Sequence, residues 1–199
     1  NNRAELDAAH VPQWFIDSCL KIGYLFPRAH AVAYVMMAFR IAWFKVYQPL
    51  AYYAAYFTIR AEGSFNAPVI LRGLASMKQE LARIAALDKP TAVEKENATV
   101  IEVAAEMYLR GLSFLPIDLE KSDASQFLMV DGKLLPPFNC IPALGDAVAK
   151  EIVLARQDHA FTSKEDLKKR GKVSQSIIDT LDSMGVLKGL PEEEQMKNR

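Results

Sequence analysis

One long stretch of this sequence carries basic residues and no acidic ones. Between Asp17 and Glu62 there is no aspartate or glutamate, although the whole chain has 24 acidic and 24 basic residues. The basic residues and the histidine within that stretch are Lys21, Arg28, His30, Arg40, Lys45 and Arg60. Cations and hydrogen-bond donors without a nearby carboxylate suit a ligand that carries phosphate, because no group of like charge repels it.

A helix must position these groups, and the apolar spacing predicts one from about Arg28 to Tyr47. At about 100° per residue, His30, Tyr34 and Lys45 fall within roughly 60° of one another, and Arg40 lies about 80° to the other side of His30. All four polar tips therefore share one face of an otherwise apolar helix. Spacing alone leaves a second interpretation equally open, which is an ordinary amphipathic helix whose polar residues meet water.

The same apolar stretch raises the question of a membrane span. Arg40 and Lys45 interrupt it, and the uninterrupted run Ala31–Phe39 is far shorter than the ~20 residues that a span requires. We therefore expect a buried helix in a soluble protein with no membrane partner.

A second kind of chemistry is predicted near the other end of the chain, where a glycine turn precedes a helix. The run Ile141–Lys150 has the form of the hairpin and second helix of a helix-hairpin-helix. Gly145 would let backbone N–H groups at the helix N-terminus approach a DNA phosphate. The motif usually has two glycines, and Ala143 occupies the first position here, which weakens the case for close approach at that point.

A second unit of this kind runs from Phe161 to Leu187, with Gly171 at its turn. From Lys150 to Lys172 there are seven bases against four acids. Two such turns in tandem, with bases around them, favour sequence-independent binding of duplex DNA. The predicted DNA-binding residues are Gly145, Lys150, Arg170, Gly171, Lys172 and Ser174.

The elements around these residues predict a mainly α fold. Helical patterns precede Gly111, and Asp131-Gly132 between two short apolar runs predicts a small β-hairpin. Short helices then follow, joined by tight turns. We expect a helical segment over residues 1–111, a duplex-DNA-binding domain with the β-hairpin and the tandem helix-hairpin-helix over 112–190, and a flexible tail over 191–199.

A family resemblance joins these features. The run Phe26–Tyr34, continued by Ala42–Val46 and Pro49, resembles the fingers motif of bacterial replicative DNA polymerases of the C family. Tyr52–Arg60 and the upstream Val11–Cys19 resemble the PolC branch, the Gram-positive type of DNA polymerase III alpha subunit. The resemblance covers almost the whole chain and identifies it as the C-terminal part of such a polymerase.

The resemblance implies roles for the residues already singled out. His30, Tyr34, Arg40 and Lys45 would sit where the fingers meet the incoming nucleotide and the template. The stretch from Leu119 to Pro191 resembles the end of PolC, which implies a duplex-binding role behind the polymerase active site.

The chemistry of nucleotide transfer is not expected within this chain. Polymerases hold two metal ions with a pair or triad of carboxylates, and the resemblance places those in the palm, upstream of Asn1. Cys19 and Cys140 are far apart and lack partners at the spacing of a zinc site, while His10 and His159 are scattered. We predict no catalytic residue, metal site or cofactor here. The Mg of the parent polymerase would be held outside this chain, and the chain alone would be inactive.

The two ends of the sequence also carry expectations. The first residue is Asn1 and not Met, which indicates a chain that is cut from something longer or has been processed. Proteins of the PolC branch end in a clamp-binding peptide that begins with Gln. Gln195 and Met196 could begin one, but no aromatic residue follows, so a frayed charged terminus is the favoured interpretation.

The sequence thus predicts a cytoplasmic DNA polymerase fragment that contacts incoming dNTP, primer-template and duplex DNA, with a doubtful sliding-clamp contact through its tail. Two alternatives stay open. One is a free-standing helix-hairpin-helix module of a repair protein, and the other is a non-catalytic helical module that binds another protein.

Overall fold

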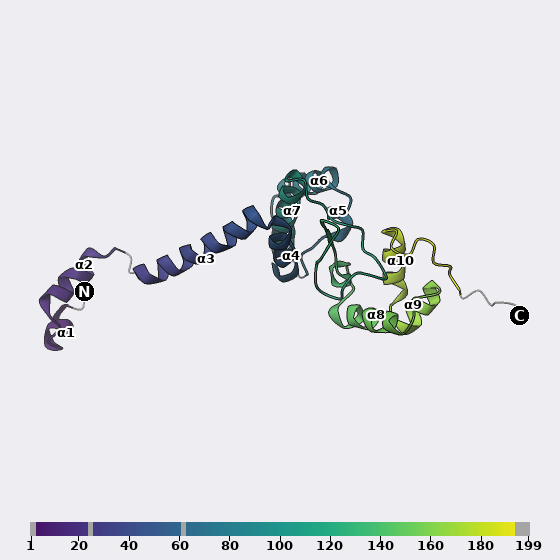
Figure 1. Cartoon of the computed structure of the whole chain (residues 1–199). Helices are drawn as coiled ribbons and strands as arrows, with labels where there is room; N and C mark the ends of the chain where they lie inside the picture. The colour runs from purple at the N-terminus through teal and green to yellow at the C-terminus, as the bar shows by residue number, and fades with distance from the viewer. Residues whose placement is uncertain (1–2, 24–25, 61–62, 194–199) are drawn as a thin grey trace, which may run out of the picture. The chain divides into compact units, whose positions relative to one another are not determined.

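The computed structural model describes residues 3–23, 26–60 and 63–193. Figure 1 shows a chain built mostly of helices, which confirms the predicted mainly α fold class. The helices are α1 (Arg3–Ala8), α2 (Gln13–Lys21), α3 (Arg28–Tyr47), α4 (Pro49–Arg60), α5 (Ala67–Ile70), α6 (Leu74–Ala85), α7 (Ala92–Leu109), the 3-10 helix η1 (Phe138–Cys140), α8 (Asp146–Asp158), α9 (Lys164–Arg170) and α10 (Gln175–Ser183).

The chain divides into two compact units, Asn1–Trp43 and Phe44–Arg199. The first holds α1, α2 and most of α3. Ile16 is the one buried residue of α2, while Trp14 on the same helix is 72% exposed. The first unit therefore buries little apolar surface of its own.

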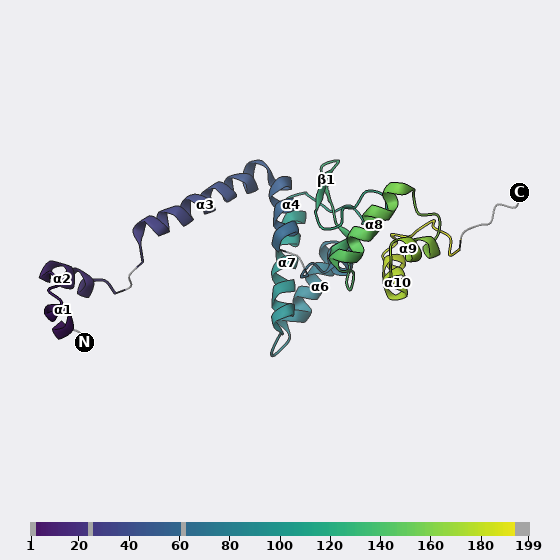
Figure 2. The ribbon, with the colours of Figure 1, turned by 90° about the horizontal axis from the view of Figure 1, so that it is seen from below.

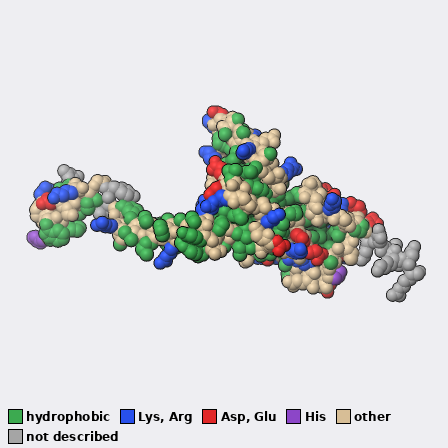
Figure 3. Space-filling view, turned by 45° about the horizontal axis from the view of Figure 1, so that its top comes forward, with side chains coloured by type: hydrophobic (Ala, Val, Ile, Leu, Met, Phe, Trp, Pro, Cys, Tyr) green, Lys and Arg blue, Asp and Glu red, His purple; other side chains and the backbone are tan. Residues whose placement is uncertain are grey.

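Helix α3 forms over the predicted residues, but it is not the buried helix that its composition suggested. None of its 20 residues is buried among the described residues, and Figure 3 shows mostly hydrophobic side chains along it. By length and composition α3 could cross a membrane, with a mean hydropathy of 1.2, although core helices of soluble proteins share that property. The prediction of burial is wrong for this chain because composition tells how apolar a helix is and not which element covers it.

The second unit is organised around four phenylalanines. The rings of Phe57, Phe65, Phe114 and Phe127 all lie near one another, with centroids between 5.0 and 6.0 Å apart in all six pairs. Aromatic pairs at such distances add to the stabilisation that burial already provides. Residues on both sides of position 111 thus share one core. The predicted boundary between a helical segment and a DNA-binding domain at this position stays a prediction.

The β-hairpin forms at the predicted place. Strand β1 (Leu128–Val130) pairs antiparallel with β2 (Lys133–Leu135), and Val130 faces Lys133 across the turn. Asp131 and Gly132 both have positive φ, 49° and 74°, as a two-residue turn of type I′ requires. The strands are shorter than the apolar runs that predicted them, because Pro136 and Pro137 follow β2 directly.

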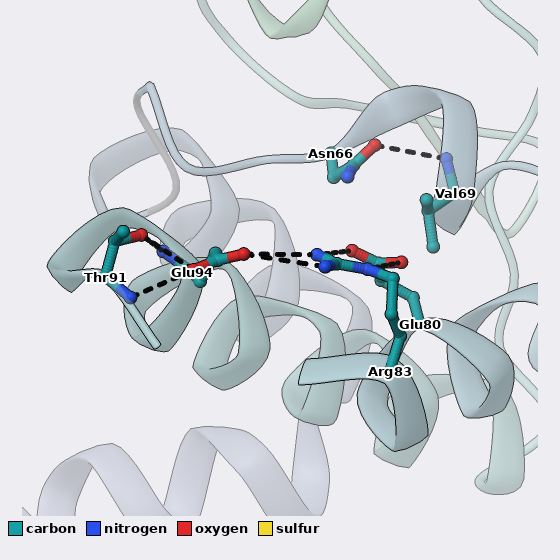
Figure 4. A network of polar contacts seen from close by, with 6 residues as sticks. All are labelled: Asn66, Val69, Glu80, Arg83, Thr91 and Glu94. Atoms are coloured by element: carbon teal, nitrogen blue, oxygen red, sulfur yellow. Dashed lines mark hydrogen bonds and ion pairs between the residues drawn. The ribbon is translucent and has the colours of Figure 1, made fainter. Parts of the chain in front are cut away.

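Helices α6 and α7 lie side by side in both ribbon views (Figures 1 and 2). Their connection is fixed by polar contacts, drawn in Figure 4. Thr91 caps α7 by accepting a hydrogen bond from the Glu94 N–H at 3.2 Å, and the Glu94 carboxylate accepts one from the Thr91 N–H at 2.9 Å. Arg83 of α6 bonds to Glu80 at 2.9 Å and reaches Glu94 at 3.5 Å.

This reciprocal cap gives a stability prediction. Thr91→Ala removes the hydroxyl that satisfies an N–H at the start of α7, so we expect the free energy of unfolding in urea to fall by about 1 kcal/mol. Thr99→Ala is the matched control, because Thr99 is exposed within the same helix, and it should be neutral or slightly stabilising. Equal losses in the two variants would contradict the role given to the cap.

Candidate nucleic-acid interface

The first hairpin turn is held by buried apolar side chains on either side of its tip. Ile141 and Leu144 are each 2% exposed, while Ala143 and Gly145 are exposed. The Leu144 N–H donates to the Ile141 carbonyl at 3.1 Å and closes the turn. Ala143 has a φ of 65°, a left-handed conformation that costs an L-residue roughly 1–2 kcal/mol. The backbone therefore adopts the shape that a glycine would favour, although the residue is alanine.

Helix α8 starts from this turn without a side-chain cap. Gly145 is its N-cap residue and makes no side-chain hydrogen bond. A Cβ at Gly145 would meet nothing within 4 Å. The N–H groups of the first turn of α8 have no partner within the helix. The exposed glycine that precedes them has no side chain that could cover them. Lys150 is exposed one turn further along.

Gly171 in the second turn has a different function from Gly145. Its φ is −81°, so it does not need the left-handed region, and that conformation falls on Lys172 with a φ of 52°. A Cβ on Gly171 would lie 2.8 Å from the Leu167 carbonyl oxygen and 3.2 Å from the Cγ1 of Ile152. A second reason for glycine is thus packing, because its Cβ position is crowded by Leu167 of α9 itself and by Ile152 of α8. The predicted approach to DNA at this turn stays a prediction.

Arg170 is used to join α8 to α9. Its guanidinium donates to the Asp166 carboxylate at 3.0 Å and to the carbonyls of His159, at 2.9 Å, and Ala155. It also lies 4.9 Å from the centre of the Phe161 ring. Burial would raise the pKa of Asp166, but the Thr162 N–H and the Arg170 guanidinium lower it. Contact with DNA would compete with these bonds, so we do not count Arg170 among the accessible cations.

Several of the seven basic residues around the second turn likewise already have a hydrogen-bond or ion-pair partner within the chain. Arg156 donates to the Leu119 carbonyl at 3.0 Å, and Lys164 pairs with Asp182 at 3.1 Å and Glu192 at 2.6 Å. Figure 3 shows acidic and basic side chains intermingled over the second unit. The exposed lysines of this region are Lys150, Lys168, Lys169 and Lys172.

Two of these exposed lysines also have a partner. Lys168 donates to the Gln175 side chain at 3.0 Å, and Lys172 pairs with Glu151 at 3.0 Å. Both contacts lie at an exposed surface, where ion pairs contribute little. Ser174, the N-cap of α10, makes no capping bond, and its hydroxyl lies 3.0 Å from that of Ser176. Helix α10 therefore also begins without a side-chain cap.

An acidic residue lies next to the polar face of α3 at the C-terminal end of the helix. The Lys45 ammonium donates to the Glu106 carboxylate of α7 at 2.7 Å and lies 5.3 Å from the centre of the Tyr52 ring. The hydrogen bond to Glu106 raises the pKa of Lys45. Arg110, the C-cap residue of α7, donates to the Lys45 carbonyl at 2.9 Å. Glu106 thus places a carboxylate beside the stretch of sequence that has no acidic residue. It lies outside that stretch, so the spacing of nearby residues could not reveal this contact.

The other three residues of this face are exposed on α3. The His30 ring lies 4.4 Å from the Tyr34 ring and 5.0 Å from the Phe26 ring, measured between centroids. Tyr34 is 65% exposed, and Arg40 is exposed without an ion pair among the described residues. His30, Tyr34 and Arg40 thus remain accessible, in contrast to Lys45.

Two further expectations concern metal and clamp binding. Within residues 3–23, 26–60 and 63–193 no group of three or more His, Cys, Asp or Glu could hold a metal ion. Gln195 and Met196, the residues predicted for clamp binding, lie outside the described residues.

Comparison with known proteins adds two findings. A family described as "Helix-hairpin-helix motif" matches residues 111–196. Proteins named "DNA polymerase III PolC-type" match nearly the whole chain: that of Thermotoga maritima is 52% identical over 192 residues, that of Pediococcus pentosaceus 51% over 193, and that of Bacillus subtilis 47% over 193. Each match covers 96% of this chain but only 13–14% of the relative's length.

The two turn glycines should respond differently to a methyl group. Gly171→Ala places a Cβ against the Leu167 carbonyl and Ile152, so we expect a loss of about 1–3 kcal/mol in the free energy of unfolding. Gly145→Ala meets open space and should change that free energy by less than about 1 kcal/mol, as expected for an exposed position. Urea denaturation of both variants measures this difference, and equal effects would contradict the close contacts around Gly171.

Proposed function

We propose, from the homology of this chain to one segment of the PolC-type DNA polymerase III proteins, that it is the part of such a polymerase that contacts nucleotide and DNA. The observation that carries the proposal is the identity of about 50% over 96% of the chain. The chain spans about one seventh of those relatives, so the activity of the whole polymerase comes to it only as a proposal. Such an enzyme would work in the cytoplasm.

The C-terminal part of the chain would hold duplex DNA by its backbone. The match to the helix-hairpin-helix motif over residues 111–196 supports this, as do the starts of α8 and α10, which lack side-chain caps. Helix N-termini donate N–H groups to phosphates, and contacts of this kind carry no sequence information. The exposed lysines Lys150, Lys168, Lys169 and Lys172 would add the cationic component.

The exposed face of α3 would contact the incoming dNTP and the template. His30, Tyr34 and Arg40 can donate hydrogen bonds to phosphate, and they are exposed. Lys45 would first have to exchange its carboxylate partner Glu106 for a phosphate. We therefore assign Arg40 the more direct role and give Lys45 a role that depends on release from Glu106.

Nucleotide transfer would need groups outside this chain. The metal-binding carboxylates of a polymerase would belong to another part of the protein, and Mg²⁺ held there would stabilise the charge that develops on the transferring phosphate. The residues of this chain would position the nucleotide and the duplex, and the chain alone would not incorporate nucleotides.

Duplex binding by the 199-residue chain gives the first test. We expect fluorescence anisotropy to show similar affinity for duplexes of unrelated sequence. The logarithm of the affinity should fall with the logarithm of salt concentration by roughly 0.9 per phosphate neutralised. Replacing Lys168, Lys169 and Lys172 by Gln should reduce that slope.

Lys78 and Lys95, exposed on α6 and α7, provide the matched control. Their replacement by Gln should leave the slope unchanged. Strong preference for one sequence, or equal effects of the two sets of substitutions, would sink this assignment.

The nucleotide face gives a kinetic test in a full-length polymerase that carries this segment. Arg40→Ala should impair use of dNTP more than binding of primer-template. A charge-assisted hydrogen bond is typically worth about 1.5–3 kcal/mol, so a loss of roughly ten- to a hundredfold is expected in KM, kcat or both. Lys45→Ala should show a similar kinetic loss only if Lys45 leaves Glu106 in the nucleotide complex.

Glu106→Gln separates the two roles of Lys45, because it weakens the ion pair and keeps the shape of the side chain. Improved use of dNTP would indicate that Glu106 competes with the nucleotide for Lys45. If dNTP kinetics stay at wild-type values in Arg40→Ala as well, the face of α3 is structural and the nucleotide assignment is wrong.

A further inference from the structure

One phenol hydroxyl in the core of the second unit is enclosed without a hydrogen bond. Tyr53 of α4 is 0% exposed, and its hydroxyl has no hydrogen-bond partner in the part of the chain that the structure describes. A phenol hydroxyl can both donate and accept, and leaving it unpaired in the interior is unfavourable. An arrangement that brings an acceptor to this hydroxyl is therefore favoured.

Three charged residues lie near the Tyr53 hydroxyl, because α4 and α7 run side by side (Figures 1 and 2). Burial raises the pKa of Tyr53, Arg110 and Lys45 lower it, and Glu106 raises it. The Arg110 guanidinium is close enough to act on this pKa but does not reach the geometry of a hydrogen bond with the hydroxyl. It donates instead to the Lys45 carbonyl at 2.9 Å.

Glu106 is the one acceptor among these three charged groups. Arginine and lysine side chains only donate, whereas an ionised carboxylate only accepts. The Tyr53 hydroxyl can therefore donate only to Glu106 in this group. The carboxylate is occupied elsewhere, because it accepts from the Lys45 ammonium at 2.7 Å and does not bond to Tyr53.

The pair of Lys45 and Glu106 lies at the edge of the core, where it can change partners. The two side chains are 31% and 41% exposed, and an ion pair with that much contact with water contributes little. Both side chains are long and rotate about several bonds. A phosphate that takes the Lys45 ammonium would leave the Glu106 carboxylate without its cation, next to a hydroxyl that needs an acceptor.

We propose that Tyr53 is a positioning residue, whose hydroxyl donates to the Glu106 carboxylate when Lys45 turns to a phosphate of the incoming nucleotide. The inference rests on the nucleotide role proposed above for Lys45 and identifies the group that makes its release easier. One hydrogen bond of Glu106 replaces another, so Lys45 does not leave an unpaired carboxylate behind. Tyr53 acts through Glu106 and does not touch the nucleotide.

Thermal unfolding of the 199-residue chain tests this exchange without nucleotide. Lys45→Met removes the ammonium and keeps an unbranched side chain, so Glu106 should turn to Tyr53. Adding Tyr53→Phe should then lower the midpoint by roughly 2–5 °C, as for loss of one hydrogen bond. In the chain that keeps Lys45, Tyr53→Phe removes an unpaired hydroxyl, so the midpoint should stay unchanged or rise.

Two comparisons make this result specific to Glu106. In the chain with Lys45→Met and Glu106→Ala no carboxylate is left for Tyr53, so Tyr53→Phe should again not lower the midpoint. Tyr56→Phe is the matched control, because Tyr56 lies on the same helix and Glu106 is not among the groups that shift its pKa. Its effect should be equal with and without Lys45→Met. Equal effects of Tyr53→Phe with and without Lys45→Met would overturn the proposal.

Kinetics of a full-length polymerase that carries this segment test whether the use of nucleotide depends on the exchange. Tyr53→Phe should raise KM for dNTP about three- to tenfold and change kcat less, because more of the free enzyme then holds Lys45 on Glu106. The rise should disappear in the Glu106→Ala enzyme, where Lys45 has no carboxylate to leave. A Tyr53 that only supports the fold would change KM by the same factor in both enzymes, which would overturn the proposal.

These outcomes separate the proposal from the function on which it rests. If Lys45→Ala impairs the use of dNTP while Tyr53→Phe has the same kinetics as Tyr56→Phe, the role of Tyr53 is wrong and the nucleotide role of Lys45 stands. If neither Arg40→Ala nor Lys45→Ala changes the use of dNTP, the nucleotide role itself is wrong. The unfolding midpoints then still decide whether Glu106 turns to Tyr53, since they need no nucleotide.

Discussion

The packing of four phenylalanines is the interaction on which the second unit depends. Phe57 of α4 and Phe65 lie before the first hairpin turn in the chain, and their rings meet Phe114 and Phe127 from the stretch around the β-hairpin. Phe127 is also tied to α4, because its N–H donates to the Thr58 hydroxyl at 3.0 Å. This contact sets residues 63–66 beside the turn that starts α8. The four rings belong to one larger core in which Ile101 and Met107 of the helical part are clustered with Phe138 and Ile141 of the hairpin part.

Much of the fold could be predicted from the sequence because the signals are local. A two-residue hairpin turn requires positive φ at two successive residues, which Asp131-Gly132 can adopt. Thr91 caps α7 together with Glu94, which lies only three residues further on. The helix-hairpin-helix turn is likewise a local pattern, and even Ala143 follows the backbone shape that the motif sets. Residue type and spacing suffice in such cases because the interacting groups are only a few positions apart.

The site could be predicted less well, because its contacts join residues far apart in the sequence. Lys45 stands in an acid-free stretch, yet Glu106 pairs with it from a distance of 61 positions. Gly171 looks like a residue that opens a turn to DNA, and the structure adds a packing constraint there from Leu167 and Ile152. Arg170 looks like a DNA-binding cation, and in the structure its guanidinium also joins two helices. A sequence shows which groups are present, while only the packing shows which of them are already satisfied.

The central claim is that the starts of α8 and α10 meet the backbone of duplex DNA. Hydrogen–deuterium exchange of the 199-residue chain, with and without a duplex, tests this claim most directly because it reports on backbone N–H groups. The account predicts slower exchange in peptides that cover residues 141–150 and 171–178, and unchanged exchange in the α6–α7 connection around Thr91. Protection that is absent from both hairpin turns, or confined to α6 and α7, would contradict it.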